Sequence, residues 1–226
     1  MGVRVFKSAI SAFAVAAGIM IFPSFGLACE GGKTLYEDKF EKLNPAWGFT
    51  IDPATEKIDP SGYAVDFPPN AYRRGLSQIG YYNDHVFCAT FTTSFTCTNK
   101  DACESQPFVG LVVLANDAKN YYAFEVATGY GNYSLSRVQN GKYLYPIGWT
   151  ALPDNKKFAS GEKFEIQATV KGSTMSSKVN GKPVLDFEGV APEGGSLIGF
   201  EVGTYASDTK NSQMSLSNVV VKELPQ

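Results

Sequence analysis

Hydrophobic and polar residues alternate one by one along much of the chain that follows Thr34. The clearest example is Val86–Cys97, in which Phe87, Ala89 and Phe91 share one parity while the residues between them are Cys88 and several Thr and Ser. Successive side chains of a β-strand point to opposite sides, so this pattern predicts a strand with one face on a core.

The same alternation recurs in further segments. These are Tyr121–Val126, Phe164–Lys171, Ile198–Val202 and Met214–Val221. In the last segment the parity of the apolar residues changes near Asn218, which predicts a β-bulge. The run Phe108–Leu114 is continuously apolar, so we expect a strand that is buried on both faces.

Turn signals separate these strands at short intervals. Asn140-Gly141 and Asn180-Gly181 are the strongest, because both residue types accept the positive φ of a type I′ hairpin turn. No segment has the periodicity of a long amphipathic helix. The pattern therefore predicts an all-β chain, folded as a two-sheet antiparallel β-sandwich.

Residues 1–28 have the composition of a signal peptide rather than of a folded element. Arg4 and Lys7 precede an uncharged apolar run, Ala9–Phe22, and small residues follow at Gly26 and Ala28. The run has 14 residues, fewer than the roughly 20 that a membrane-spanning helix needs. We therefore expect a periplasmic or secreted protein whose single domain comprises residues 29–226.

Cys29 directly follows the expected cleavage site, which leaves a lipoprotein as the alternative. A lipid anchor on Cys29 would tether the domain to a membrane. The residues before it, Gly26-Leu27-Ala28, match the usual lipoprotein signal only in part, because the aliphatic residue is one position out of register.

The chain has four cysteines, and an oxidising compartment favours disulfides. Cys97 and Cys103 bracket a short polar segment and form the pair that we favour, with Cys29–Cys88 as its complement if Cys29 carries no lipid. Closing the 97–103 loop would contribute about 2 kcal/mol in the chain-entropy model. The spacing of the cysteines fits no zinc site.

Without residues 1–28 the chain has 18 basic and 22 acidic residues, a net charge of −4. Nucleic-acid binding needs a basic face, so this balance argues against nucleic acid as a partner. It argues equally against docking on an anionic lipid surface.

Several motifs in Phe108–Val221 carry a family resemblance. They include Val109-Gly110-Leu111-Val112, Asn120 to Val126, Val179-Asn180-Gly181-Lys182 and Leu216 to Val221, and the opening Tyr36-Glu37-Asp38-Lys39-Phe40 also fits. The chain resembles the LamG-like and 3-keto-disaccharide-hydrolase-like modules of the concanavalin A-like lectin/glucanase superfamily. The resemblance implies a jelly-roll sandwich, whereas the function of such modules varies and must be argued from a site.

Glycoside hydrolysis by the glucanase branch of this superfamily would use the order Glu-x-Asp-x-x-Glu on one strand. That pattern does not occur in the chain, and neither Glu125 nor Glu201 has a second carboxylate two residues away. His85, the only histidine, has no nucleophile elbow near it in the sequence. We therefore predict no catalytic residue.

Carbohydrate binding is the better-supported function. The predicted ligand-binding residues are aromatic, acidic and basic side chains between positions 121 and 149: Tyr121, Glu125, Tyr133, Arg137, Tyr143 and Trp149. Tyr121 and Glu125 share the parity opposite to the predicted core, so both can line one sheet face. Arg137 would add a bidentate hydrogen-bond donor.

Two alternatives stay open beside a non-catalytic glycan-binding module of the envelope or periplasm. One is a hydrolase or lyase that acts on a glycoside or polysaccharide without the glucanase motif, and the other is an envelope domain that contacts proteins. We expect no cofactor except a possible structural calcium ion, for which Glu37, Asp38 and Asn218 are the candidate ligands if the terminal strands pair.

Overall fold

The computed structural model describes residues 29–99, 102–103 and 105–226. The expected signal peptide, residues 1–28, lies outside the described residues. The elements, in chain order, are β1 (Thr34–Asp38), η1 (Pro45–Trp47), β2 (Glu56–Asp59), β3 (Gly62–Phe67), β4 (Tyr72–Leu76), β5 (His85–Ser94), β6 (Cys97–Asn99), β7 (Ala102–Cys103), β8 (Pro107–Asp117), β9 (Asn120–Ala127), β10 (Asn132–Gln139), β11 (Lys142–Ala151), η2 (Pro153–Asn155), β12 (Lys163–Lys171), β13 (Thr174–Val179), β14 (Lys182–Glu188), β15 (Leu197–Thr204) and β16 (Ser212–Lys222).

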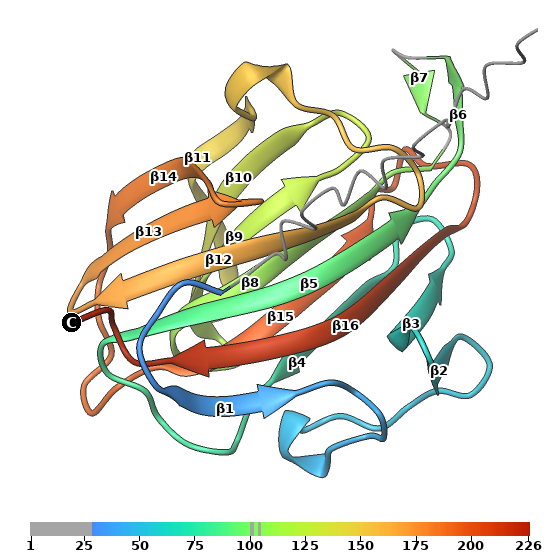
Figure 1. Cartoon of the computed structure of the whole chain (residues 1–226). Coiled ribbons are helices and arrows are strands. Elements are labelled where there is room, and N and C mark those ends of the chain that lie inside the picture. Colours follow the sequence, from blue (N-terminus) through green and yellow to red (C-terminus); the bar gives the residue numbers. More distant parts are fainter. Residues whose placement is uncertain (1–28, 100–101, 104) are drawn as a thin grey trace, which may run out of the picture.

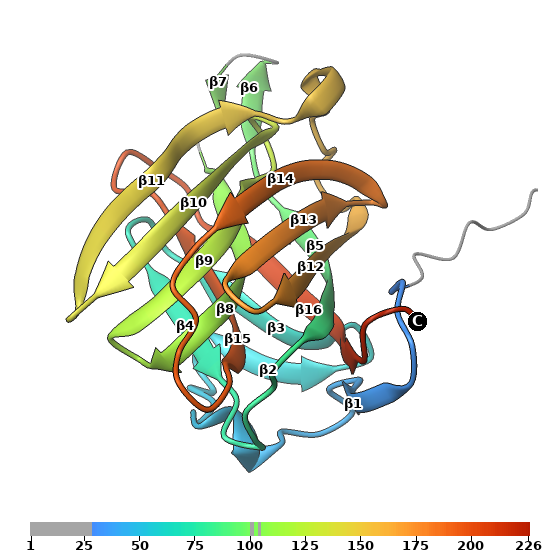
Figure 2. The same ribbon diagram turned by 90° about the vertical axis from the view of Figure 1, so that its left-hand side faces the viewer.

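Within the described residues, two antiparallel sheets form the layers of a sandwich (Figure 1). One has eight strands, in the order β14-β13-β12-β5-β16-β3-β2, with β1 paired to β16. The other has six strands, in the order β11-β10-β9-β8-β15-β4, and these lie side by side in Figure 2. The predicted all-β sandwich is confirmed.

The core between the layers is built by the predicted alternation. Phe87, Ala89 and Phe91 of β5 are buried in it, opposite Leu111 and Phe124 from the six-stranded sheet. The strand itself is shorter than the predicted 86–97, because β5 ends at Ser94 and the chain continues into the small β6–β7 hairpin. β8 is buried on both sides, as its continuous apolar run predicts.

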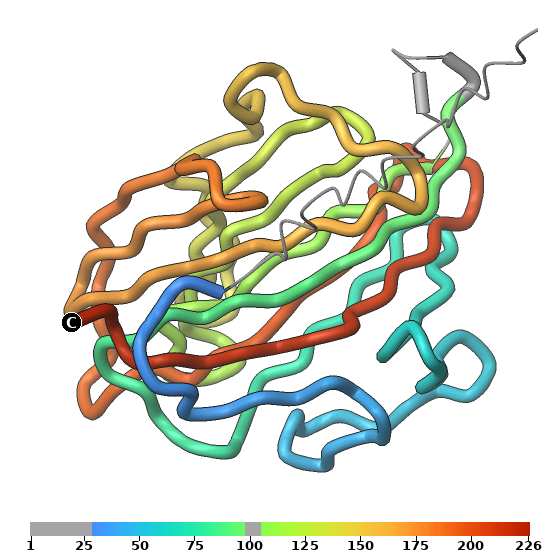
Figure 3. The backbone as a smooth tube through the Cα atoms, in the orientation of Figure 1, coloured from blue at the N-terminus to red at the C-terminus, as the bar shows by residue number. Residues whose placement is uncertain are grey.

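Local geometry confirms the turn and bulge signals. Asn140, Gly141, Asn180 and Gly181 all have positive φ and connect β10 to β11 and β13 to β14. The register of β16 against β5 shifts between Leu216 and Asn218, where the change of parity predicts a bulge. The first and last strands lie side by side, which the backbone trace shows at β1 and β16 (Figure 3).

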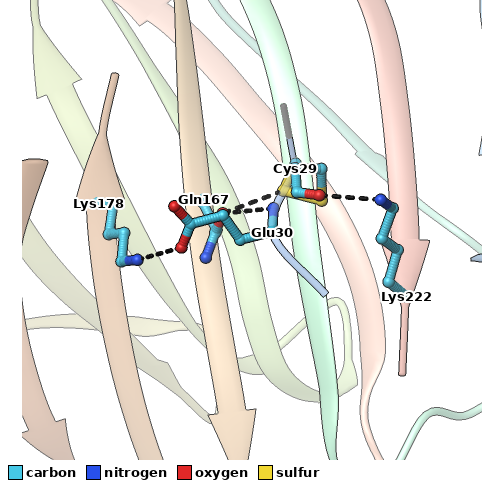
Figure 4. The surroundings of a disulfide bond; sticks show 6 residues. Cys29, Glu30, Gln167, Lys178 and Lys222 are labelled. Carbon is cyan, nitrogen blue, oxygen red and sulfur yellow. Dashed lines mark hydrogen bonds and ion pairs between the residues drawn. A yellow bond between two sulfur atoms is a disulfide. The ribbon is translucent and has the colours of Figure 1, made fainter. Parts of the chain in front are cut away.

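A disulfide ties the start of the domain to the middle of the eight-stranded sheet. Cys29 and Cys88 are bonded, with a Cα–Cα distance of 5.7 Å. Figure 4 shows the adjoining contacts: the Glu30 amide donates to Gln167, the Glu30 carboxylate pairs with Lys178, and the Lys222 ammonium donates to the Cys29 carbonyl. The predicted Cys29–Cys88 pair is confirmed.

The backbone register brings the two cysteines of the second predicted pair, Cys97 and Cys103, opposite each other. Cys97 is disulfide-bonded and stands opposite Cys103 in the β6–β7 ladder.

No helix within the described residues is long and apolar enough to cross a membrane.

The Cys29–Cys88 disulfide closes a loop of 59 residues, so its removal is expected to be costly. In the chain-entropy model Cys29→Ala/Cys88→Ala loses about 4 kcal/mol of unfolding free energy, which lowers the melting temperature by about 10 °C. If Cys97 and Cys103 form the predicted pair, which closes a much shorter loop, Cys97→Ala/Cys103→Ala loses about 2 kcal/mol.

Thermal unfolding measures the stability of both variants, and mass spectrometry of the non-reduced protein identifies the state of Cys29. A sulfur in a disulfide cannot also carry a thioether-linked lipid, so an acylated Cys29 would contradict the assignment.

Candidate functional site

The outward face of the six-stranded sheet carries the candidate site. On β9, Tyr122, Phe124 and Val126 belong to the core, so Tyr121 and Glu125 point away from it. Tyr121 packs there on a separate small cluster with residues such as Val112 and Val138. Alternate residues of the neighbouring strands also point away from the core, and we call the sheet surface that they form the outer face.

One row of residues crosses five adjacent strands of the outer face. The register pairs Arg74 of β4 with Glu201 of β15, Glu201 with Gly110 of β8, Gly110 with Glu125 of β9, and Glu125 with Ser134 of β10. Two glutamates therefore flank one glycine in the middle of the sheet.

Gly110 leaves the space in which the two glutamates meet. A Cβ atom at this position would lie 2.5 Å from the carbonyl oxygen of Phe124 and 3.2 Å from Cγ of Glu125. Any larger residue would push Glu125 away from β15. The glycine is thus a packing requirement of the carboxyl pair.

The carboxyl groups of Glu125 and Glu201 are buried and lie on either side of Gly110, close enough to interact directly. Among the described residues, Oε1 of Glu201 has no N–H or O–H partner, while Oε2 of Glu125 accepts from the Ser134 hydroxyl at 2.6 Å. Two carboxylates in contact both lack a donor, so one of them must hold a proton. The pair is therefore a carboxylic acid bonded to a carboxylate.

Burial raises the pKa of both groups, and the hydrogen-bond donors around Glu201 favour the proton on Glu125. The pKa of Glu125 is raised well above its ordinary value, first by desolvation and then by the nearby charge of Glu201. Desolvation also raises the pKa of Glu201, but hydrogen bonds from Glu125, Tyr72 and Tyr121 and the charge of Arg74 favour its ionised form. The two groups titrate as a pair, which retains one proton over a wider pH range than a free carboxyl does.

Three tyrosine hydroxyls cover the ionised end of this pair. Tyr72 donates to Oε2 of Glu201 at 2.5 Å, and Tyr121 reaches the same oxygen at 3.3 Å. The hydroxyl of Tyr121 lies 3.4 Å from that of Tyr72 and 3.2 Å from that of Tyr143. We call Tyr72, Tyr121 and Tyr143 the tyrosine cover.

Arg74 determines which hydroxyls of the tyrosine cover donate and which accept hydrogen bonds. Its Nη1 donates to the hydroxyl oxygen of Tyr121 at 2.5 Å, and its guanidinium lies 4.8 Å from the centre of that ring. A guanidinium only donates, so the Tyr121 hydroxyl accepts a hydrogen bond from Arg74 and donates its own hydrogen bond to Glu201. Tyr143 then donates to Tyr121. Burial beside Glu201 raises the pKa of Tyr72 and Tyr121, so both stay protonated donors.

Large aromatic side chains are exposed around this buried centre. Tyr143, Tyr145 and Trp149 from β11 are 46%, 59% and 39% exposed, and Tyr72 from β4 is 43% exposed. Tyr143 and Tyr145 are stacked with ring centres 6.5 Å apart, and Trp149 packs edge-on against Tyr205. The outer face thus combines exposed aromatic rings with a buried polar centre, which is the Glu125–Glu201 pair and the hydroxyls around it.

A groove of about 600 Å³ adjoins this surface beside β4. Arg74 and Leu76 line it together with polar and aromatic residues of the neighbouring loops, among them Gln78, Tyr81 and Asn116. Arg74 therefore faces both the tyrosine cover and the groove. Within the described residues it forms no ion pair with a carboxylate.

The structure brings four of the six predicted ligand-binding residues to one face and separates the other two. Tyr121, Glu125, Tyr143 and Trp149 lie on the outer face. Tyr133 and Arg137 do not lie on it.

Arg137 and Tyr133 point toward the core side of β10. The Arg137 guanidinium lies 5.2 Å from the centre of the Tyr122 ring, and Tyr133 packs on Phe124. The predicted grouping of Tyr121, Glu125 and Arg137 is therefore not formed. Residue 137 has the parity of buried Leu135, which places it on the opposite side of the strand from Ser134.

The residues of the site that were not predicted include Tyr72, Arg74, Gly110, Ser134 and Glu201. For Glu201 a signal exists, because Ile198, Phe200 and Val202 form the core parity of its strand and leave residue 201 on the other face. For β4 no comparable signal exists, since its sequence Tyr-Arg-Arg-Gly-Leu does not alternate between apolar and polar residues.

The candidate calcium ligands lie where the first and last strands meet. Asp38 stands opposite Val219, next to Asn218, so the terminal strands pair, which is the condition for these candidates. Asp38 already accepts from the Phe40 amide, the Tyr36 hydroxyl and the Trp47 indole, and Glu37 pairs with Lys39. Within the described residues no three His, Cys, Asp or Glu side chains form a metal-binding group, and calcium stays a prediction.

His85 is the first residue of β5 and is fully buried. Its Nδ1 lies 2.6 Å from the carbonyl oxygen of Asn83, and burial lowers its pKa. It lies outside the site.

Comparison with known proteins shows a shared fold but no family. The sequence matches no protein-family model and no curated protein. Three similar solved structures are the carbohydrate-binding module CBM66 from Bacillus subtilis, a GH16 protein of the mixed linkage glucan PUL of Bacteroides ovatus in complex with a G4G4G3G product, and a structure from work on endo-acting O-glycanases that members of the human gut microbiota express to initiate mucin breakdown.

The likeness covers most of each chain at low identity. For CBM66 the identity is 15%, with 74% of this chain and 91% of the other covered at a TM-score of 0.55. The GH16 structure is 8% identical and has a TM-score of 0.60, with 83% of this chain and 99% of the other covered. The structure from the work on O-glycanases is 11% identical and has a TM-score of 0.59, with 85% of this chain and 100% of the other covered. At these identities the comparison shows the sandwich fold, which this chain shares with carbohydrate-binding modules and glycoside hydrolases.

Because the pKa of Glu125 is raised, the carboxyl pair makes the domain less stable as pH rises. Above pH 4.5 the unfolded chain releases the proton that the folded pair retains, so the free energy of unfolding falls. Glu125→Gln supplies a permanent N–H donor to Glu201 and removes this fall. We expect it to stabilise the domain by about 1 kcal/mol or more at pH 8, with little effect near pH 4.5.

Urea unfolding at both pH values measures the difference from wild type, with Glu188→Gln on exposed β14 as the control. A loss of stability in Glu125→Gln that is equal at both pH values would contradict the shared proton.

Proposed function

We propose that the outer face of the six-stranded sheet binds a glycan. The observation that carries this proposal is the set of exposed aromatic rings, Tyr72, Tyr143, Tyr145 and Trp149, around a polar centre. Rings of this kind stack on the apolar C–H faces of pyranoses, and carboxylates, hydroxyls and guanidinium groups bind sugar hydroxyls. The carbohydrate-binding and carbohydrate-cleaving proteins of the same fold support the assignment.

We favour binding over hydrolysis because of how the two glutamates meet. A retaining glycosidase holds its two carboxyls roughly 5 Å apart and an inverting one farther apart, so that a glycosidic bond or a water fits between them. Glu125 and Glu201 instead interact directly with each other beneath the tyrosine cover. A sugar ring cannot enter between groups in contact.

The carboxyl pair is also the observation that favours an enzyme, the second candidate function. A protonated Glu125 beside an ionised Glu201 has the proton states of a general acid and a base. A substrate that displaced the tyrosine cover would reach both groups. Release of reducing ends from a bound polysaccharide, abolished by Glu125→Gln, would establish this activity.

We place the domain outside the cytoplasm, in the periplasm or secreted. The Cys29–Cys88 disulfide supports this location, since such bonds persist in oxidising compartments. Within the superfamily, the LamG-like and 3-keto-disaccharide-hydrolase-like modules are the groups that the sequence motifs favour.

A pair of neighbouring residues on β11 tests the proposed face. Tyr145 and Leu144 are similarly exposed, at 59% and 47%, but successive residues of a strand point in opposite directions, and Leu144 stands opposite the inward-facing Arg137. Tyr145→Ala is therefore expected to weaken glycan binding about tenfold, which corresponds to about 1.4 kcal/mol, and Leu144→Ala to leave it unchanged.

A glycan array identifies the ligand, and isothermal titration calorimetry measures both variants against the strongest hit. Equal loss in the two variants, or no binding of any glycan by wild type, would refute the proposed face.

A further inference from the structure

The proton shared by Glu125 and Glu201 is connected to the exposed rings by a continuous set of contacts. Oε1 of Glu201 is left to the carboxyl of Glu125, while Oε2 of Glu201 holds the hydroxyls of Tyr72 and Tyr121. Tyr143 in turn contacts Tyr121. Movement of the Glu201 carboxylate therefore affects Tyr72 on β4 and, through Tyr121, Tyr143 on β11, the two edge strands of the sheet.

We propose that this carboxyl pair is a proton-controlled switch for the glycan-binding face. With the shared proton present, the pair fixes the tyrosine cover and the aromatic surface is ordered. When the proton is lost, the two carboxylates separate, the cover is released and glycan affinity falls. The proposal rests on the proposed function for its ligand and on the geometry of the pair for its mechanism.

Loss of the proton puts two negative charges in direct contact in a buried place, where their repulsion is only weakly screened. The titratable and charged groups that surround the pair are few. They are Tyr72 and Arg74 on β4, Tyr121 on β9, Tyr143 and Tyr145 on β11, and Tyr205 in the loop after β15, beside Asp208. Among the residues that the structure describes, Arg74 is the one cation in this set, and it is bonded to Tyr121 rather than to either carboxylate.

The direction in which Glu201 can move links the charge to the cover. Gly110 separates the two glutamates along the row, and the Glu125 side chain already fills the space above it. On its other side Glu201 faces β4, and Tyr72 and Tyr121 bind its other oxygen there, so a shift of Glu201 away from Glu125 moves toward these hydroxyls. Separation of the carboxylates therefore displaces those hydroxyls.

Near-ultraviolet circular dichroism of the ligand-free protein from pH 5 to 9.5 tests the switch without a ligand. The aromatic signal of wild type is expected to decrease reversibly as pH rises, and that of Glu125→Gln to stay constant because its amide replaces the proton. Glu201→Gln serves as a second proton-independent variant if the first does not fold, and Glu188→Gln is the control that must behave as wild type. Identical titrations of wild type and both pair variants would overturn the proposal.

Calorimetry with soluble mixed-linkage β-glucan at pH 6 and pH 9 then couples the switch to binding. We expect wild type to lose at least tenfold in affinity between these pH values, and Glu125→Gln to change less than twofold. Equal losses in both proteins would overturn the coupling. Absence of glucan binding at pH 6 would count against the proposed function with this glycan, while the ligand-free titration still decides the switch.

Discussion

Two buried carboxyl groups that touch must hold a proton between them, and the site depends on this constraint. Glu125 and Glu201 come from strands that are not neighbours, and Gly110 on the strand between them leaves the space for contact. Burial of two carboxyl groups, one of them ionised, is costly unless their oxygens find partners. Ser134 and the tyrosine cover provide these partners, so the centre of the outer face is polar yet closed to solvent.

The sandwich positions this centre through strand pairing rather than through loops. Five consecutive strands of the six-stranded sheet bring Arg74, Glu201, Gly110, Glu125 and Ser134 into one row, although they span 128 positions of the sequence from 74 to 201. The opposite side of the same strands packs on the core through residues such as Phe124 and Phe200. A rigid core on one side therefore fixes the geometry of the polar groups on the other.

Much of the fold and part of the site could be predicted from the sequence. Alternation in β5, β9 and β15 identifies core-facing residues, and it correctly places Tyr121 and Glu125 together on the outer face. Arg137 was assigned by residue type rather than by parity, and the parity of Leu135 places it on the other side.

The order of strands could not be predicted in this way. That β15 lies between β8 and β4, which brings Glu201 beside Gly110 and Arg74, follows from pairing between distant segments. Alternation gives the face of each side chain but not its neighbours across the sheet. The carboxyl pair was therefore beyond the reach of the sequence pattern, although each glutamate was assigned to a strand.

Infrared difference spectroscopy of the ligand-free protein at pH 7 tests the shared proton most directly. The account predicts a carbonyl stretching band of a buried, protonated carboxylic acid in wild type, and its loss in Glu125→Gln. A wild-type spectrum at pH 7 that shows only ionised carboxylates would contradict the account.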